Sequence, residues 1–179
     1  RRYYCGFTRS NGYLIVTENK VSLVTDKRYT TQAQQQTINV DIREHAANWL
    51  ELVADTIRSM GITRMVMEAC MTVDKYFPLK EKLPEVEVCF EQEYFLEQRM
   101  VKDEEEIVCT RAAIAAAEAG FDKLIPRLRI GMTEKDLADE LHYLVSKEGA
   151  EAMSFGTIVG SGARGALAHA FPTEKKIEN

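Results

Sequence analysis

The pattern of the sequence changes near residue 98, and this change predicts a chain built in two parts. Before it, short apolar segments rich in strand formers alternate with amphipathic stretches, which is typical of an α/β domain. After it, Lys102–Glu106 begins a long alanine-rich helix, whose acidic first turn complements the helix dipole. We therefore expect an α/β domain over residues 1–98 and the first part of a second domain over residues 99–179.

Several short elements are predicted in the first part. Gly12–Thr17 and Val21–Thr25 flank a polar turn and predict a β-hairpin. Apolar residues at helical spacing, beginning at Trp49, predict a helix that stops at Gly61. The remaining predicted elements are helices over 28–36 and 72–82 and strands over 40–42, 64–68 and 86–88. Together they indicate a sheet partly covered by helices.

The second part predicts two consecutive helices. Its alanine-rich helix should let another element approach closely, and its apolar face is marked by Ile107, Ile114, Phe121 and Leu124. Thr133 and Asp136 resemble a capping box that opens the next helix, which Gly149 ends. The apolar residues of this helix are Leu137, Leu141, Leu144 and Val145. We interpret the charge runs of this part as solvated helix faces.

A glycine-dense segment follows these helices. Ser154–Gly165 predicts a short strand that enters a loop, in which the glycines at 160, 162 and 165 permit positive φ and close backbone approach. Such loops often line pockets, although turn chemistry alone is the simpler interpretation. A phosphate cradle is disfavoured because no Gly-Lys-Ser/Thr follows and no strand–glycine–helix order is evident.

Composition excludes several classes of protein. The 179 residues are 45% hydrophobic and 28% charged, which is ordinary globular usage. The net charge of −5 disfavours nucleic acid as a partner, and the longest apolar run, Ala112–Ala117, is too short to span a membrane. The start of the chain is no signal peptide, and Arg1 is no natural initiator. We therefore expect a longer protein, of which this chain is a piece truncated at both ends.

The cysteines and histidines are scattered along the chain. Cysteines at positions 5, 70, 89 and 109 lack the close spacing of a zinc or redox motif. We expect reduced, mostly buried thiols in a cytoplasmic protein. His45, His142 and His169 lie equally far apart, so no metal site can be assembled from local spacing.

Four segments, in order along the chain, resemble those of a known family. They are Tyr3–Thr17, similar to "YLxGFTGSNG…LLVT"; Val24–Ala33, similar to "TDxRYxxQA"; Arg99–Ile107, similar to "RxxKxxxEI"; and Ser154–His169, similar to "SFxTIVxSGxxxALPH". The family is that of the proline-specific metallopeptidases, Xaa-Pro aminopeptidase and Xaa-Pro dipeptidase, with creatinase as a relative. Two departures are Arg9, where glycine is usual, and Ala168, where proline is usual.

The resemblance implies a fold and an activity. The fold is a creatinase/prolidase-like N-terminal α/β domain followed by the start of an α+β pita-bread catalytic domain, which methionine aminopeptidase shares. The activity is metal-assisted hydrolysis of Xaa-Pro peptide bonds by two divalent ions. Carboxylate-rich ligation suits Mn²⁺, while imidazole also allows Co²⁺ or Zn²⁺. All five ligands of the family lie downstream of His169, so we name no metal ligand in this chain and expect the chain alone to be inactive and to bind no metal.

The resemblance also implies site residues and partners. His169 matches a pocket histidine that hydrogen-bonds the substrate or the tetrahedral intermediate, whereas His45 and His142 are expected to be structural. The family usually forms homodimers or higher homo-oligomers, in which the N-terminal domain borders the neighbour's active site. Arg9 could there pair with the carboxylate of a short proline-containing peptide, although an exposed turn arginine is the simpler interpretation.

Two other functions stay open. Some relatives keep the fold without the metal ligands and serve as peptide- or histone-binding modules. Creatinase-type amidine hydrolysis keeps the fold and the histidine without metals. The residues downstream would separate these alternatives, and they would also separate aminopeptidase from dipeptidase.

Overall fold

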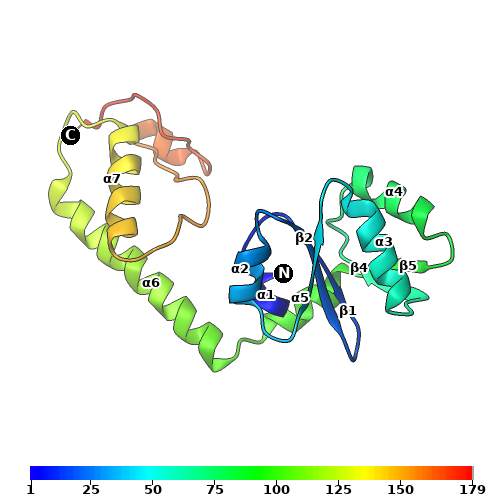
Figure 1. The fold of residues 1–179 in the computed structure, drawn as a ribbon. Helices are drawn as coiled ribbons and strands as arrows, with labels where there is room; N and C mark the ends of the chain where they lie inside the picture. The colour runs from blue at the N-terminus through cyan, green and yellow to red at the C-terminus, as the bar shows by residue number, and fades with distance from the viewer. Residues whose placement is uncertain (179) are drawn as a thin grey trace. The chain divides into compact units, whose positions relative to one another are not determined.

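The computed structural model describes residues 1–178, apart from the side chain of Gln92, and the chain forms two compact units that divide between Met100 and Val101 (Figure 1). Each unit has its own helices and its own buried residues. Each therefore packs around a core of its own.

A three-stranded sheet organises the first unit. The predicted hairpin is confirmed: β1 (Tyr13–Val16) and β2 (Val21–Asp26) pair antiparallel, with Tyr13 opposite Val24. β3 (Asp41–His45) pairs parallel to β2, so the strand order is β1-β2-β3. A parallel neighbour needs a crossover, which contains the short helix α2 (Thr30–Gln36).

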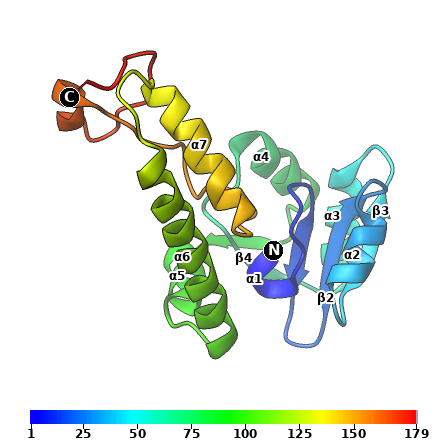
Figure 2. The same cartoon turned by 90° about the vertical axis from the view of Figure 1, so that its left-hand side faces the viewer.

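Both faces of this sheet are covered (Figure 2). Adjacent residues of β2 point to opposite sides of the sheet, and both sides are buried. On one side Leu23 packs with Phe7 and with Ala33 of α2. On the other side Val24 belongs to a larger cluster that includes α3 (Trp49–Ser59) and α4 (Val73–Lys82). Asn48 caps α3 by accepting from the backbone N–H groups of the residues at 50 and 51. Gly61 follows with φ +70°, as its role as a stop predicts.

The first unit holds a second, separate sheet in place of the single sheet that we expected. β4 (Arg64–Met67) and β5 (Glu87–Phe90) pair parallel and, within the described residues, form no ladder with the first three strands. The helix α3 lies between β3 and β4 in the chain, and the cluster around α3 and α4 joins the two sheets through side chains. The strand predicted at 86–88 is β5, which covers residues 87–90 and so begins one residue later.

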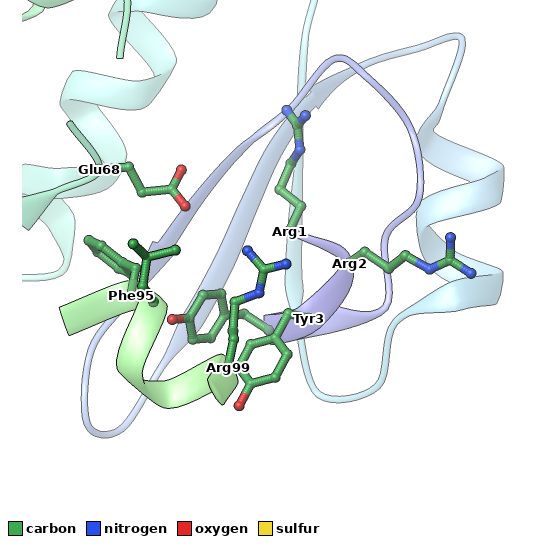
Figure 3. Close-up of a pocket in the computed structure, with 8 residues that line it drawn as sticks. Arg1, Arg2, Tyr3, Glu68, Phe95 and Arg99 are labelled. Atoms are coloured by element: carbon green, nitrogen blue, oxygen red, sulfur yellow. The ribbon is translucent and has the colours of Figure 1, made fainter. Parts of the chain in front are cut away.

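Two helices of the first unit escaped prediction. α1 (Arg2–Cys5) and α5 (Gln92–Met100) lack an apolar stripe, and tertiary contacts hold them together. The hydroxyl of Tyr3 donates to the carbonyl oxygen of Gln98 at 2.6 Å, and the hydroxyl of Tyr4 donates to its Oε1 at 2.9 Å. A pocket of about 170 Å³ lies beside these contacts, lined by Glu68 and arginines as well as aromatic rings (Figure 3). Figure 3 shows Arg1 and Arg2 diverging from each other.

Two antiparallel helices form the framework of the second unit. α6 (Glu104–Leu124) leads through a 3-10 turn, η1 (Ile125–Arg127), to α7 (Glu134–Lys147), and the two helices lie side by side in Figure 1. The predicted capping box of Thr133 and Asp136 is confirmed. Another capping box, Asp103 with Glu106, opens α6.

The predicted apolar face of α6 is partly wrong. Ile114 and Phe121 are 51% and 52% exposed, whereas Ala116, Gly120 and Leu124 are buried. The reason is the close helix crossing that the alanine-rich sequence predicted: a Cβ on Gly120 would lie 2.5 Å from Cγ2 of Val145. Ala116 and Gly120 lie four residues apart and let the helices approach, so these two residues, with Leu124, form the buried stripe instead of Ile114 and Phe121.

The strand predicted at the start of Ser154–Gly165 is absent from the described structure. This segment is irregular until a short 3-10 helix, η2 (Gly162–Ala166). A strand needs a paired neighbour, and in the described residues 154–160 one backbone hydrogen bond reaches another segment, from the N–H of Val159 to the carbonyl of Ala170 at 3.1 Å. The strand-forming residues alone therefore did not suffice.

Candidate functional site

His169 lies in the second unit, on the segment that follows η2, and its side chain is exposed. The next residue, Ala170, is buried and accepts the backbone hydrogen bond from Val159. Gly160 lets the chain close on itself here, since a Cβ at this position would lie 2.6 Å from the carbonyl oxygen of Arg164 and 2.9 Å from Cβ of Ala170. The backbone beside His169 is therefore closely held, while its imidazole faces outward.

A buried carboxylate holds this loop from within. Glu134, in the first turn of α7, is fully buried and accepts hydrogen bonds from both ends of the loop. Its Oε1 accepts from the N–H and the hydroxyl of Ser161 at 2.8 and 3.0 Å. Its Oε2 accepts from the N–H and the hydroxyl of Thr173 at 3.1 and 2.7 Å. Nε of Arg164 lies 3.1 Å from each oxygen, so one side chain bridges the whole loop.

The electrostatics of Glu134 follow from these donors. The hydroxyl of Thr173 contributes most, and with the hydrogen bonds from Ser161 it outweighs the cost of burial, lowering the pKa of Glu134 to about 2. Arg164 supplies the countercharge and also donates from Nη2 to the carbonyl of Phe171 at 2.7 Å. At neutral pH the carboxylate is therefore ionised, paired and supplied with hydrogen-bond donors.

The chain after the loop is fixed to the same helix end. Residues 173–177 run alongside residues 131–135, with a bridge between Thr133 and Lys176. The N–H of Glu134 donates to the carbonyl of Lys175 at 3.0 Å, and the N–H of Lys135 donates to that of Thr173 at 3.2 Å. The loop thus returns to the helix from which Glu134 projects.

Sequence reasoning missed Glu134. The interpretation of the charge runs as solvated helix faces is wrong at this position, because the side chain turns inward to donors that lie 27 to 39 residues further along the chain. No local pattern distinguishes it from the neighbouring acids of the first turn. The signal that marks it is the partner set, which only the folded chain assembles.

The remaining histidines do not join His169. His142 is exposed on α7. His45 ends β3, and both of its ring nitrogens are buried without a hydrogen-bond partner in the described part of the chain. Over residues 1–178, no group of three or more His, Cys, Asp or Glu side chains could hold a metal ion. The divalent ions of the metallopeptidase family therefore do not fit the residues that the structure describes.

Arg9 lies on an exposed loop of the first unit, where its Nε donates to Oε1 of Gln32 at 2.7 Å. It lines neither the pocket of the first unit nor the groove of about 880 Å³ on α6 and α7 of the second. The prediction of mostly buried thiols is wrong: Cys70 and Cys109 are exposed, and Cys5 and Cys89 are half-buried. Cys5 ends the short helix α1, Cys70 lies in a turn and Cys89 in β5, and Cys109 lies away from the buried stripe of α6.

Comparisons with known proteins agree with this architecture. Residues 1–101 match the creatinase/prolidase N-terminal domain, and residues 108–179 match metallopeptidase family M24. The chain therefore belongs to the creatinase/prolidase family, and the predicted fold class, an N-terminal creatinase-like domain followed by the start of the catalytic domain, is confirmed. No helix within residues 1–178 is long and apolar enough to cross a membrane.

Three relatives illustrate the likeness. An uncharacterized peptidase of Bacillus subtilis (strain 168) is 33% identical over 99% of this chain and 51% of its own length. The X-Pro aminopeptidase from Thermotoga maritima MSB8 is 34% identical with a TM-score of 0.90, over 99% of this chain and 51% of that one. The Xaa-Pro dipeptidase from Bacillus anthracis is 31% identical with a TM-score of 0.92, over 99% and 50%. The chain thus spans about half the length of the relatives it matches.

Proposed function

We propose that the full-length protein hydrolyses Xaa-Pro peptide bonds, with residues 1–98 as its N-terminal domain and residues 99–179 as the first part of its catalytic domain. The observation that supports this proposal is likeness along 99% of the chain to an X-Pro aminopeptidase and to a Xaa-Pro dipeptidase. Because the two relatives carry different names, both release of an N-terminal residue and cleavage of a dipeptide belong to the proposal. We further propose a cytoplasmic homodimer or higher homo-oligomer.

The proposed activity depends on divalent metal ions. We propose two ions in the full-length enzyme, with Mn²⁺ preferred over Co²⁺ and Zn²⁺, held by residues other than those of the described range. The test is to assay alanyl-proline and a longer Xaa-Pro peptide before and after chelation, and then after each metal is restored. The 179-residue chain alone should show neither turnover nor two tight Mn²⁺ sites by calorimetry. Turnover by the chelated full-length protein would contradict the metal dependence.

His169 is proposed as the catalytic residue, and it also binds the substrate. Its exposed imidazole, on a closely held backbone, is suited to hydrogen-bond a peptide or the tetrahedral intermediate. In the full-length enzyme, His169→Ala should lower kcat by roughly 10²–10³-fold, the effect of losing one preorganised hydrogen bond, while the metal content stays unchanged. Wild-type turnover, or loss of a metal equivalent, would contradict this role.

Arg9 is proposed, second, to bind the carboxylate of a dipeptide at the neighbouring subunit's site. It is exposed, and its bond to Gln32 uses Nε, so its terminal nitrogens can form a bidentate pair. Arg9→Ala should then raise KM for dipeptides more than for longer peptides, whose carboxylate lies further away. Lys27→Ala, which removes another exposed cation, is the control. Equal effects on both substrates would leave Arg9 a surface residue.

Two alternatives remain outcomes of the same experiments. A full-length protein that binds proline-containing peptides without turnover, at any metal concentration, would be a binding module. Hydrolysis of creatine in place of peptides would indicate a creatinase-type amidinohydrolase. Each result differs from the proposed peptidase in substrate or in turnover.

A further inference from the structure

We propose that Glu134 is the positioning residue for His169. The carboxylate fastens the first end of the segment 161–173 through Ser161 and its last end through Thr173, and His169 lies between them. This inference rests on the proposed function for the role of His169. The clamp itself rests on the described hydrogen bonds alone.

The division of labour between the two oxygens makes the clamp specific to a carboxylate. Oε1 accepts from Ser161, Oε2 accepts from Thr173, and Nε of Arg164 reaches both. All of these groups are donors, and a carboxylate is the one side-chain group of this shape that offers acceptors on both sides. A glutamine at this position keeps one oxygen and turns an NH₂ donor toward the donors at the other end. It can therefore hold one end of the segment but not both.

The clamp has a rigid base. Glu134 lies in the first turn of α7, where the helix dipole favours an anion and a capping box fixes the helix start. Its own N–H donates to the carbonyl of Lys175, and Nζ of Lys175 donates to the hydroxyl of Ser161 at 3.1 Å. The helix therefore fixes the position of the carboxylate, and the hydrogen bonds of the carboxylate fix the position of the loop.

A buried ion pair contributes little net stability compared with a packed apolar core, but its directional bonds fix one geometry. Here the pair serves a segment whose glycines would otherwise leave the backbone free, since Gly162 adopts φ +54° and Gly160 makes a close approach. A catalytic imidazole displaced by about 1 Å can lose roughly 10²-fold in rate. Precise positioning of the His169 imidazole therefore requires that both ends of the segment are fixed.

The test uses Glu134→Gln in the full-length protein, with Glu174→Gln as a matched control. Glu174 pairs with Lys135 on the surface, so the control neutralises an exposed carboxylate that lies one residue beyond the segment and pairs with the same helix end. We expect Glu134→Gln to lower kcat for alanyl-proline by roughly 10²-fold and to raise amide exchange in residues 159–175, with exchange in α6 and in the first unit unchanged. Glu174→Gln should change neither.

A double-mutant cycle asks whether Glu134 acts through His169. In the His169→Ala background, Glu134→Gln should reduce kcat by less than about threefold, because coupled residues are not additive. A reduction as large as in the wild-type background would overturn the positioning role. A rise in exchange spread evenly over the second unit would also overturn it, since that result indicates general stabilisation.

A milder variant guards against a misfolded Glu134→Gln. Thr173→Val removes one donor to Oε2 and leaves the carboxylate and Arg164 in place, so the fold should persist while exchange at the last end of the segment rises. Unchanged amide exchange in both variants, together with Xaa-Pro hydrolysis by the wild-type protein, would refute the clamp and leave the proposed function standing. Raised exchange in a protein that hydrolyses no Xaa-Pro peptide would refute the proposed function while leaving the clamp.

Discussion

Over residues 1–178, each unit contains one buried carboxylate paired with an arginine, but the two pairs are built differently. Asp26, at the end of β2, is 6% exposed and accepts from the N–H, Nε and Nη2 of Arg28, only two residues away. Glu134 is fully buried and its partners come from 27 to 39 residues away. The first carboxylate closes a turn, and the second holds a loop to a helix.

The two pairs differ in whether water can reach the groups that lose their partner when the pair is broken. The Arg28 side chain is 69% exposed, so water can solvate it when the pair is broken. Among the described residues, Asn11 is the one distant donor of a hydrogen bond to the Asp26 carboxylate. The Arg164 side chain is 30% exposed and the donors of Ser161 and Thr173 face inward. Local pairing therefore organises a turn that solvent can support, whereas distant pairing organises a loop that depends on it.

The largest effect is expected from Glu134→Ala. This change leaves Arg164 and the donors at both ends of the segment without their acceptor, and unsatisfied buried donors are costly. Protection against amide exchange over residues 159–175 should fall roughly 10- to 100-fold, with no change in the first unit. Exchange-detected mass spectrometry of wild type and variant measures both. If the first unit loosens equally, the two carboxylates do not act on separate units.

Acidification should separate the two carboxylates without mutation. The pKa of Glu134 is lowered from its ordinary 4.5 to about 2, so its stabilisation is complete above pH 4.5 and is lost as the pH falls toward 2. Hydrogen bonds from Arg28, followed by that from Asn11, hold the pKa of Asp26 well below its ordinary 3.8, so its loss begins at lower pH. Protection factors corrected for intrinsic exchange should fall first at residues 159–175. In Glu134→Gln this early loss should disappear.

The sequence predicted what is local and missed what is assembled by distance. The hairpin, α3 with its stop at Gly61, and the capping box of Thr133 all follow from neighbouring residues, and all are confirmed. α5 escaped because its contacts are with Tyr3 and Tyr4, more than ninety residues away. The role of Glu134 was missed for the same reason, because its partners are distant in the sequence. A strand was wrongly predicted after Ser154, because a strand also depends on a distant paired neighbour. Resemblance to a family, rather than periodicity, singled out His169.

A smaller, confined effect is expected from Asp26→Asn. The variant keeps one oxygen for the N–H of Arg28, so the turn can still close, but it loses the charge and the second acceptor. Protection should fall about tenfold or less around residues 26–29 and near Asn11, and it should stay unchanged in the second unit. Amide exchange in the same experiment as above provides the comparison. Loss of protection throughout β2 would mean that Asp26 supports the sheet as well as the turn.

The smallest effect is expected from Arg28→Met, and its contrast with Arg164→Met is the finest test of the comparison. The Arg28 side chain is exposed, so its guanidinium is solvated with or without its partner, and Arg28→Met should change protection by no more than a few-fold. Asp26 keeps its bonds to Asn11 and to the backbone N–H at position 28. Arg164→Met instead leaves the buried Glu134 without its countercharge, and the loop should lose protection by a clearly larger factor. Equal effects of the two variants would contradict the comparison, because the more exposed Arg28 should be easier for water to replace than Arg164.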